Sequence, residues 1–234
     1  MATSLWQNNQ FRLFLASVSF SGAAMAMQQL LITWLLVGIL LLPATQVGLL
    51  QALMGLPGII LMLWGGAVAD RTDPRSLLIQ VYSLAWLFPI GLFTAVQFEL
   101  LNLWSVGLFG LTMSTAIAYA SPSQQAILNR VAGPQVQRGV TLSTMASFIV
   151  QIIGLGISGQ MENVGVDIVL LIQSASLVLA ALAVRQLVPA QPAETGQRNT
   201  WDVIVEGFRA VYDNRTILHT MIITFISGIF NYGA

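Results

Sequence analysis

The densest group of charged side chains directly follows a long uncharged stretch. Four of the six residues from 70 to 75 are charged, whereas residues 13–69 carry no ionisable side chain. An aspartate such as Asp70 can accept hydrogen bonds from a helix N-terminus or from an arginine. Arg71 and Arg75, four positions apart, can reach phosphate headgroups or an acidic partner. The pattern predicts a turn that makes specific contacts at a membrane boundary, and a plain positively charged turn is the alternative interpretation.

Side chains suited to catalysis are scarce. The chain has one histidine, His219, and no cysteine. Without cysteine there is no disulfide, no cysteine metal site and no thiol nucleophile, and one histidine is too few for a histidine metal site. No acid lies inside an apolar stretch where it would act with His219. We therefore predict no enzyme activity, no bound metal and no cofactor, and leave coupling to a proton gradient open.

The overall composition is that of a membrane protein. Hydrophobic residues make up 56% of the 234 residues, charged residues only 8%, and the mean hydropathy is +0.78. A soluble globular chain carries about 25% charged residues. The net charge is zero and lysine is absent, which excludes a basic nucleic-acid-binding protein.

Uncharged runs long enough to cross a bilayer recur along the chain. One helical span needs about 20 apolar residues, so residues 13–69 are long enough for two spans, with a turn at Pro43. The runs predict seven helical spans, at residues 13–40, 45–69, 76–97, 101–126, 139–160, 166–187 and 216–234. The predicted fold class is an all-α, polytopic membrane protein, with a six-helix bundle followed by the start of a second half.

The arginines predict the orientation. With these spans, all nine arginines fall on one side of the membrane, and the loops on the other side hold only Glu99, Glu162 and Asp167. The positive-inside rule then places the N-terminus in the cytoplasm. We expect a multi-pass protein of the plasma membrane, the inner membrane of a bacterium.

Polar and turn-forming residues divide the chain after the sixth span. Residues 1–188 form the predicted six-span N-terminal domain, and residues 189–200, rich in proline, glycine and polar side chains, a cytoplasmic linker. Apolar residues at helical spacing in 201–215 favour an amphipathic helix on the membrane surface, or equally an ordinary helix packed against the loop. Residues 216–234 are the predicted seventh span and the only part of a second half.

The charged turn carries a family resemblance. Gly66, Asp70, Arg71 and Arg75, here called the signature-loop residues, lie between spans 2 and 3 and resemble the signature loop of the major facilitator superfamily. Six spans followed by a cytoplasmic linker are similar to that superfamily's N-terminal half. The stretch Pro122-Ser-Gln-Gln-Ala, placed after span 4, the glycine-rich end of span 5 and the stretch before span 7 resemble its bacterial macrolide and siderophore efflux branch.

The resemblance implies transport of small organic molecules, as efflux by alternating access, with the signature loop stabilising one state. Span 4 lacks the arginine linked to proton coupling in many exporters, and Leu155 replaces the proline of the antiporter motif, so coupling and direction are left open. An importer of the same fold, and a non-transporting scaffold or fragment, are the alternatives. The implied partners are lipid, an unidentified small solute, and a missing C-terminal half or a second copy; nucleic acid is not expected.

Polar residues at helical spacing inside the spans are candidates for the solute path. In the superfamily's fold, helices 1, 4 and 5 border the cavity, which the resemblance transfers to this chain. The candidate cavity-lining residues are Gln28, Gln29, Thr33, Thr115, Tyr119, Ser147 and Gln151. Hydroxyl residues at such spacing also suit plain helix packing, and Gly154, Gly156 and Gly159 are predicted to pack against a neighbouring helix. An uncharged lining suits an amphipathic or apolar solute.

Overall fold

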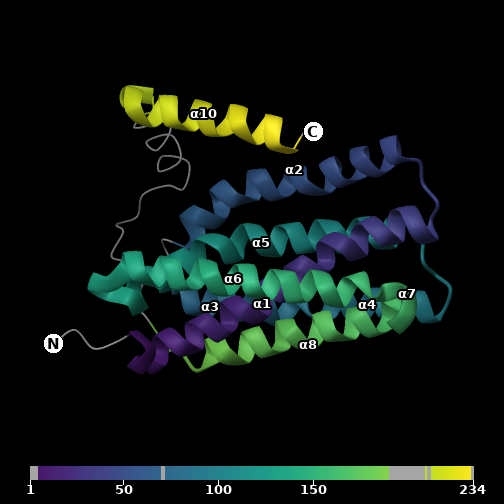
Figure 1. The fold of residues 1–234 in the computed structure, drawn as a ribbon, viewed down its shortest axis with the longest axis horizontal. Coiled ribbons are helices and arrows are strands. Elements are labelled where there is room, and N and C mark those ends of the chain that lie inside the picture. The colour runs from purple at the N-terminus through teal and green to yellow at the C-terminus, as the bar shows by residue number, and fades with distance from the viewer. Residues whose placement is uncertain (1–4, 70–71, 190–208, 210–211, 233–234) are drawn as a thin grey trace. The chain divides into compact units, whose positions relative to one another are not determined.

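Helices make up the computed structural model, which describes residues 5–69, 72–189, 209 and 212–232 (Figure 1). The chain divides into two units, Met1–Ala193 and Glu194–Ala234. In the second unit the principal described element is α10 (Arg215–Tyr232). Of the predicted linker only residue 189 is described, and of the predicted amphipathic helix only residues 209 and 212–215.

The first unit is a bundle of long segments, each antiparallel to the preceding one, in which the third segment consists of two consecutive helices (Figure 1). Its elements are η1 (Leu5–Gln7), α1 (Asn9–Trp34), η2 (Leu35–Ile39), α2 (Ala44–Ala69), α3 (Pro74–Ala85), α4 (Leu87–Gln97), α5 (Leu103–Ala132), η3 (Gly133–Gln135), α6 (Val136–Gly159), α7 (Met161–Val164) and α8 (Val166–Arg185).

Length and hydropathy identify the membrane-crossing part of the described chain. Four helical stretches, of which the third joins α5 and α6, are long and apolar enough to cross a bilayer: Asn9–Ile39, Pro74–Gln97, Leu103–Gly159 and Val166–Arg185. No strand occurs among the residues described. The predicted all-α, polytopic membrane fold is confirmed.

The third predicted span consists of two helices, which corrects the single helix expected over 76–97. α3 ends at Ala85 and α4 begins at Leu87. Pro89 has no N–H to offer the carbonyl group of Ala85, and its ring crowds that carbonyl, so the helix is interrupted here. Ser174 of α8 donates a hydrogen bond from Oγ to the carbonyl oxygen of Trp86, at 3.1 Å. α8 thereby provides a hydrogen-bond donor for the backbone carbonyl group at the break between α3 and α4.

The fourth predicted span continues past its expected end at residue 126, as far as Ala132. Pro122 lies inside this helix, which corrects its placement after the span. A proline inside a helix removes one hydrogen bond of the backbone ladder, and here the ladder resumes beyond it. Gln124 and Gln125 follow the proline within this same helix.

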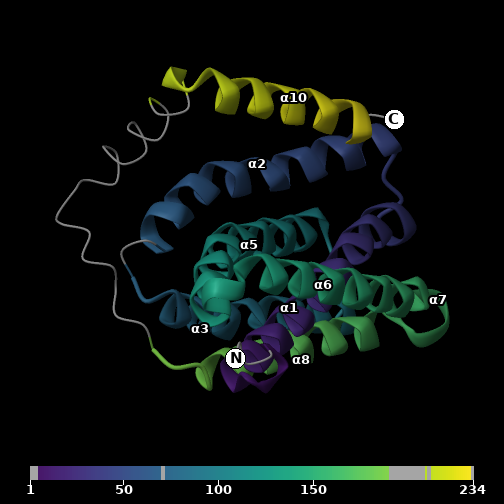
Figure 2. The same ribbon diagram turned by 60° about the vertical axis from the view of Figure 1, so that its left-hand side comes forward.

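The central helix of the bundle is α1. It packs against α5, α6 and α8, while α3 packs against α5 and α8, α4 mainly against α8, and α2 against α5. Figures 1 and 2 show α2 and α8 on opposite sides of the bundle. The fully buried residues include Phe11, Leu31 and Leu35 of the first membrane stretch and Leu170 of α8. Because lipid is as apolar as these side chains, close packing and hydrogen bonds hold such helices together.

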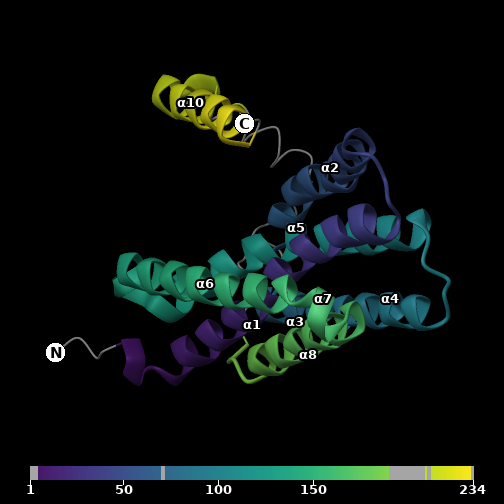
Figure 3. The ribbon, with the colours of Figure 1, turned by 45° about the vertical axis from the view of Figure 1, so that its right-hand side comes forward.

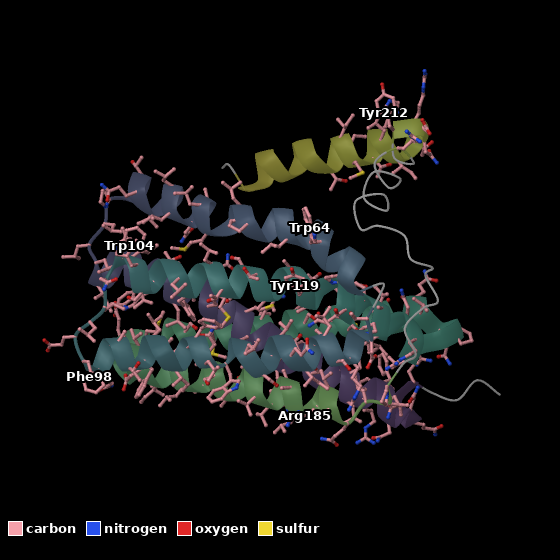
Figure 4. The ribbon with its side chains drawn as sticks, turned by 180° about the vertical axis from the view of Figure 1, so that it is seen from behind. Trp64, Phe98, Trp104, Tyr119, Arg185 and Tyr212 are labelled. Atoms are coloured by element: carbon pink, nitrogen blue, oxygen red, sulfur yellow. The ribbon has the colours of Figure 1, made fainter. Side chains whose placement is uncertain are left out.

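The two ends of the first unit differ in charge. At one end of the unit, here called the arginine end, each of five helices has an arginine near its first or last residue: Arg12, Arg75, Arg130, Arg138 and Arg185. The opposite, acidic end holds Glu99, Glu162 and Asp167. Figure 4 shows Phe98 and Trp104 at the acidic end, with Arg185 toward the arginine end. Which end faces the cytoplasm is still a prediction from the positive-inside rule.

Candidate solute cavity

A cavity of about 430 Å³ lies between α1, α2, α5 and α6. Four glutamine side chains line it: Gln28 and Gln29 from α1, Gln51 from α2 and Gln151 from α6. The rest of its wall is small or apolar, apart from the hydroxyl of Ser114 on α5. No ionisable side chain is among its described lining residues. Primary amides both donate and accept hydrogen bonds, so the cavity offers neutral polar groups in an apolar wall.

Close approach of two helices fixes one side of this cavity. A Cβ atom at Gly154 of α6 would stand 2.7 Å from the carbonyl oxygen of Ala23 on α1. Only glycine permits this distance, so α1 and α6 meet backbone to backbone just beside the cavity, as Figure 3 shows for the course of the two helices. Gly154 therefore packs tightly against a neighbouring helix.

Gly156 and Gly159, also predicted to pack against a neighbouring helix, make no such close approach within the described part of the chain. A Cβ atom at either position would meet nothing described within 4 Å. Gly159 instead lines a third cavity, of about 450 Å³, near the acidic end. Successive helix positions are rotated by about 100°, so neighbours of a packing glycine point elsewhere.

A second cavity extends the polar surface toward the arginine end. It measures about 200 Å³ and lies between α1, α5 and α6. Its polar lining includes Gln124 and Gln125 from α5, and Ser147 and Gln151 from α6. Gln151 lines both cavities. One face of α6 thus carries a continuous polar track from the arginine end to the middle of the bundle.

The sequence of residues 2–233 matches the transmembrane secretion effector family. The chain belongs to this family. The family is part of the major facilitator superfamily, which confirms the predicted superfamily, and the chain has a role in membrane transport and efflux. A search of curated proteins finds no match.

In this member of the transmembrane secretion effector family, several candidate residues meet at the cavities. Gln28, Gln29 and Gln151 line the first cavity, and Ser147 lines the second. Thr33 lies outside both, in the third cavity. Its Oγ1 accepts a hydrogen bond from Nε2 of Gln51 at 3.0 Å, so it holds a lining residue of the first cavity.

The candidates on α5 are displaced from the cavity. Thr115 donates from Oγ1 to the carbonyl oxygen of Leu111, at 2.9 Å, and neither Thr115 nor Tyr119 is among the residues that line the three cavities. Ser114, the immediate neighbour of Thr115, lines the first cavity instead. Thr115 is one position further along the helix and is therefore turned by about 100° from Ser114 around the helix axis.

Two glutamines important to the site were not among the candidates from the sequence. Gln51 lines the first cavity. Gln124 donates from Nε2 to the hydroxyl oxygen of Tyr82 on α3 at 2.6 Å and to Oγ of Ser21 on α1 at 3.2 Å. The signal that could have found them is an amide inside an apolar helix, since such a group avoids lipid and points into the protein.

The signature loop is described only in part. Asp70 and Arg71 lie outside the described residues. Asp73 caps α3, because its Oδ1 accepts from the backbone N–H of Arg75 at 3.2 Å and its Oδ2 from Oγ of Ser76 at 3.0 Å. Arg75 donates from Nη2 to the carbonyl oxygen of Arg185 at 2.6 Å. The described part of the loop thus makes contacts within the first unit.

Proposed function

We propose that this protein exports small, uncharged organic solutes by alternating access, and that the glutamine-lined cavity is where its first unit contacts the solute. The observation that carries the proposal is the lining itself. Gln28, Gln29, Gln51 and Gln151 surround one space, with apolar residues such as Met25 between them. A solute with an apolar body and a few hydrogen-bonding groups complements such a wall.

The absence of charge on the described lining argues against ionic solutes. An ion that enters a membrane-buried site loses its hydration, and it needs an opposite charge or many oriented dipoles in return. Among the described lining residues of the first cavity no carboxylate or guanidinium group could serve. Any proton-coupling group would lie elsewhere in the transporter.

Alternating access requires a second bundle that faces this one. A second copy of the chain, or further sequence of a longer protein, would supply it. The tight contact of α1 and α6 at Gly154 suits a bundle that moves as one body. Asp70 and Arg71 are proposed to stabilise one of the two states. The narrower resemblance to macrolide and siderophore exporters stays a prediction.

The test compares three radiolabelled solutes that share one aromatic side chain and differ in charge: N-acetyltryptophanamide, which is neutral, N-acetyltryptophan, an anion, and tryptophanamide, a cation. The purified protein is reconstituted into vesicles, and the flux of each solute is compared with that of protein-free vesicles. We expect protein-dependent flux of the neutral solute in excess of both ions. Faster flux of either ion would contradict the proposed solute class. The absence of protein-dependent flux of all three would favour the non-transporting scaffold, and flux in the inward direction alone would favour the importer.

A further inference from the structure

One glutamine of the second cavity is held by two buried hydroxyl groups. Gln124 of α5 lines this cavity, and its Nε2 atom donates to the hydroxyl oxygen of Tyr82 on α3 at 2.6 Å and to Oγ of Ser21 on α1 at 3.2 Å. Tyr82 and Ser21 are each only 1% exposed, and neither lines the cavity. A primary amide has two N–H hydrogens, so each hydrogen of Gln124 has an acceptor in the bundle core.

The hydrogen bond that Ser21 donates decides how this amide is turned. Oγ of Ser21 gives its single hydrogen to the carbonyl oxygen of Val18, at 3.3 Å, so toward Gln124 it can only accept. The amide nitrogen of Gln124 therefore faces the core, and the amide oxygen is turned away from Ser21. No described group donates to Oε1 of Gln124, and this atom is not one of the buried side-chain atoms that lack a partner. It is accessible, and the second cavity is the space that Gln124 lines.

A second lining residue of this cavity also offers only an acceptor. Ser143 of α6 lines the cavity, and it donates its hydroxyl hydrogen to the carbonyl oxygen of Gly139 in its own helix, at 2.8 Å. Its Oγ can then accept a further hydrogen bond but cannot donate one. No ionisable side chain is among the described residues that line the cavity. The two lining groups whose hydrogens are already used, in Gln124 and Ser143, are therefore both neutral acceptors.

We propose that the second cavity is a subsite that recognises a hydrogen-bond donor of the solute, an N–H or O–H group, through Oε1 of Gln124. This inference rests on the proposed function and narrows its solute class to neutral molecules with an apolar body and at least one donor. Gln151 lines both cavities, so a solute bound beside it has access to both. Tyr82 is a positioning residue, because its hydroxyl group holds the amide nitrogen of Gln124 toward the core.

The test compares two neutral solutes that differ in one donor group: N-acetyltryptophanamide, whose carboxamide has two N–H hydrogens, and its N,N-dimethyl derivative, whose carboxamide has none. Equilibrium binding of each radiolabelled solute to the purified full chain in detergent gives its dissociation constant. We expect the primary amide to bind roughly 2–10-fold more tightly, the effect of one hydrogen bond. Equal or tighter binding of the dimethyl derivative would overturn the proposal, because an amide of Gln124 turned the other way would offer the cavity an N–H group.

A variant of Gln124 separates the lost hydrogen bond from the added size of the two methyl groups. Gln124→Met keeps the length of the side chain but removes Oε1, and it should bring the two dissociation constants to within about twofold of each other. Gln186→Met is the matched control and should keep the preference of the parent. Gln186 is exposed directly after α8, and its amide donates to the carbonyl oxygen of Leu182 in that helix. A preference that survives Gln124→Met would overturn the proposal.

The positioning role of Tyr82 has its own readout. Tyr82→Phe keeps the ring but removes an acceptor of the amide of Gln124, which is then free to turn, so the preference for the primary amide should fall by about twofold or more. Tyr212→Phe removes the same atom from an exposed tyrosine and should leave the preference unchanged. Melting temperatures show that both variants are folded. An unchanged preference in a folded Tyr82→Phe variant would overturn the positioning role, even if that variant melts at a lower temperature.

Flux measurements in vesicles distinguish this inference from the proposed function. Protein-dependent flux of both solutes, together with equal dissociation constants, would overturn the donor subsite and leave the proposed function standing. Binding that prefers the primary amide, without flux of either solute, would support the subsite and contradict the proposed transport. The absence of both binding and flux for the two solutes would overturn the subsite and the proposed function together.

Discussion

Arg75, near the start of α3, donates a hydrogen bond from Nη2 to the carbonyl oxygen of Arg185, the last residue of α8, at 2.6 Å. The last carbonyl groups of a helix have no partner within the helix, and a cation there also interacts favourably with the helix dipole. A signature-loop arginine thus joins the third and sixth membrane segments at the arginine end. Nearby, Arg130 donates from Nη2 to the carbonyl oxygen of Val188, three residues beyond the end of α8, at 2.8 Å.

The first prediction concerns this contact. Arg75→Ala should lower the free energy of unfolding by about 0.5–1.5 kcal/mol, because it leaves the carbonyl oxygen of Arg185 to water and removes a cation from the helix end. Thermal unfolding of the purified protein in detergent measures the change. Arg138→Ala is the matched control, since Arg138 is an exposed residue at the same end of the bundle. Equal losses in the two variants would contradict the assigned role.

The second prediction contrasts two glycines of α6. Gly154→Ala should destabilise the protein by about 1–3 kcal/mol, because the new Cβ atom would collide with the backbone of α1. Gly156→Ala has open space and should be neutral or stabilising by up to about 1 kcal/mol, since alanine favours the helix. Melting temperatures of both variants measure these changes in stability. A shift of the same sign and size in both would rule out the backbone contact between α6 and α1 at Gly154.

The third prediction tests the residue shared by the two cavities. Gln151→Leu should reduce flux of N-acetyltryptophanamide by roughly 2–10-fold, the effect of one lost hydrogen bond, while the protein stays folded. Gln137→Leu, at an exposed position of the same helix outside both cavities, should transport as the unchanged protein does. Flux that is equal in the two variants would place the solute elsewhere.

The fourth prediction tests the orientation. The chain has no cysteine, so any thiol labelling of a single-cysteine variant comes from the introduced residue. Asn163→Cys, exposed at the acidic end, should react with a membrane-impermeant thiol reagent in intact cells, and Thr72→Cys, exposed at the arginine end, only after the cells are opened. The cysteine-free parent shows the background. Labelling of Thr72→Cys from outside would reverse the topology.

The sequence alone is enough to locate the long apolar helices of the first unit. Ionisable groups are too costly to place in lipid, so the uncharged runs are the candidate spans, and the positive-inside rule favours arginines on one side of them. An amide is likewise unfavourable against lipid, which is why Gln28, Gln29 and Gln151 can be recognised as candidate lining residues from the pattern of residue types.

Only the tertiary structure decides how each helix is rotated and which surfaces meet. Sequence spacing predicts the polar stripe on α5 but not its angle to the neighbours, so Ser114 rather than Thr115 lines the cavity. Whether a glycine mediates packing depends on a helix that is distant in sequence, as Ala23 is from Gly154. The meeting of Gln124 with Tyr82 and Ser21 depends likewise on α5 packing against α3 and α1, which no local pattern encodes.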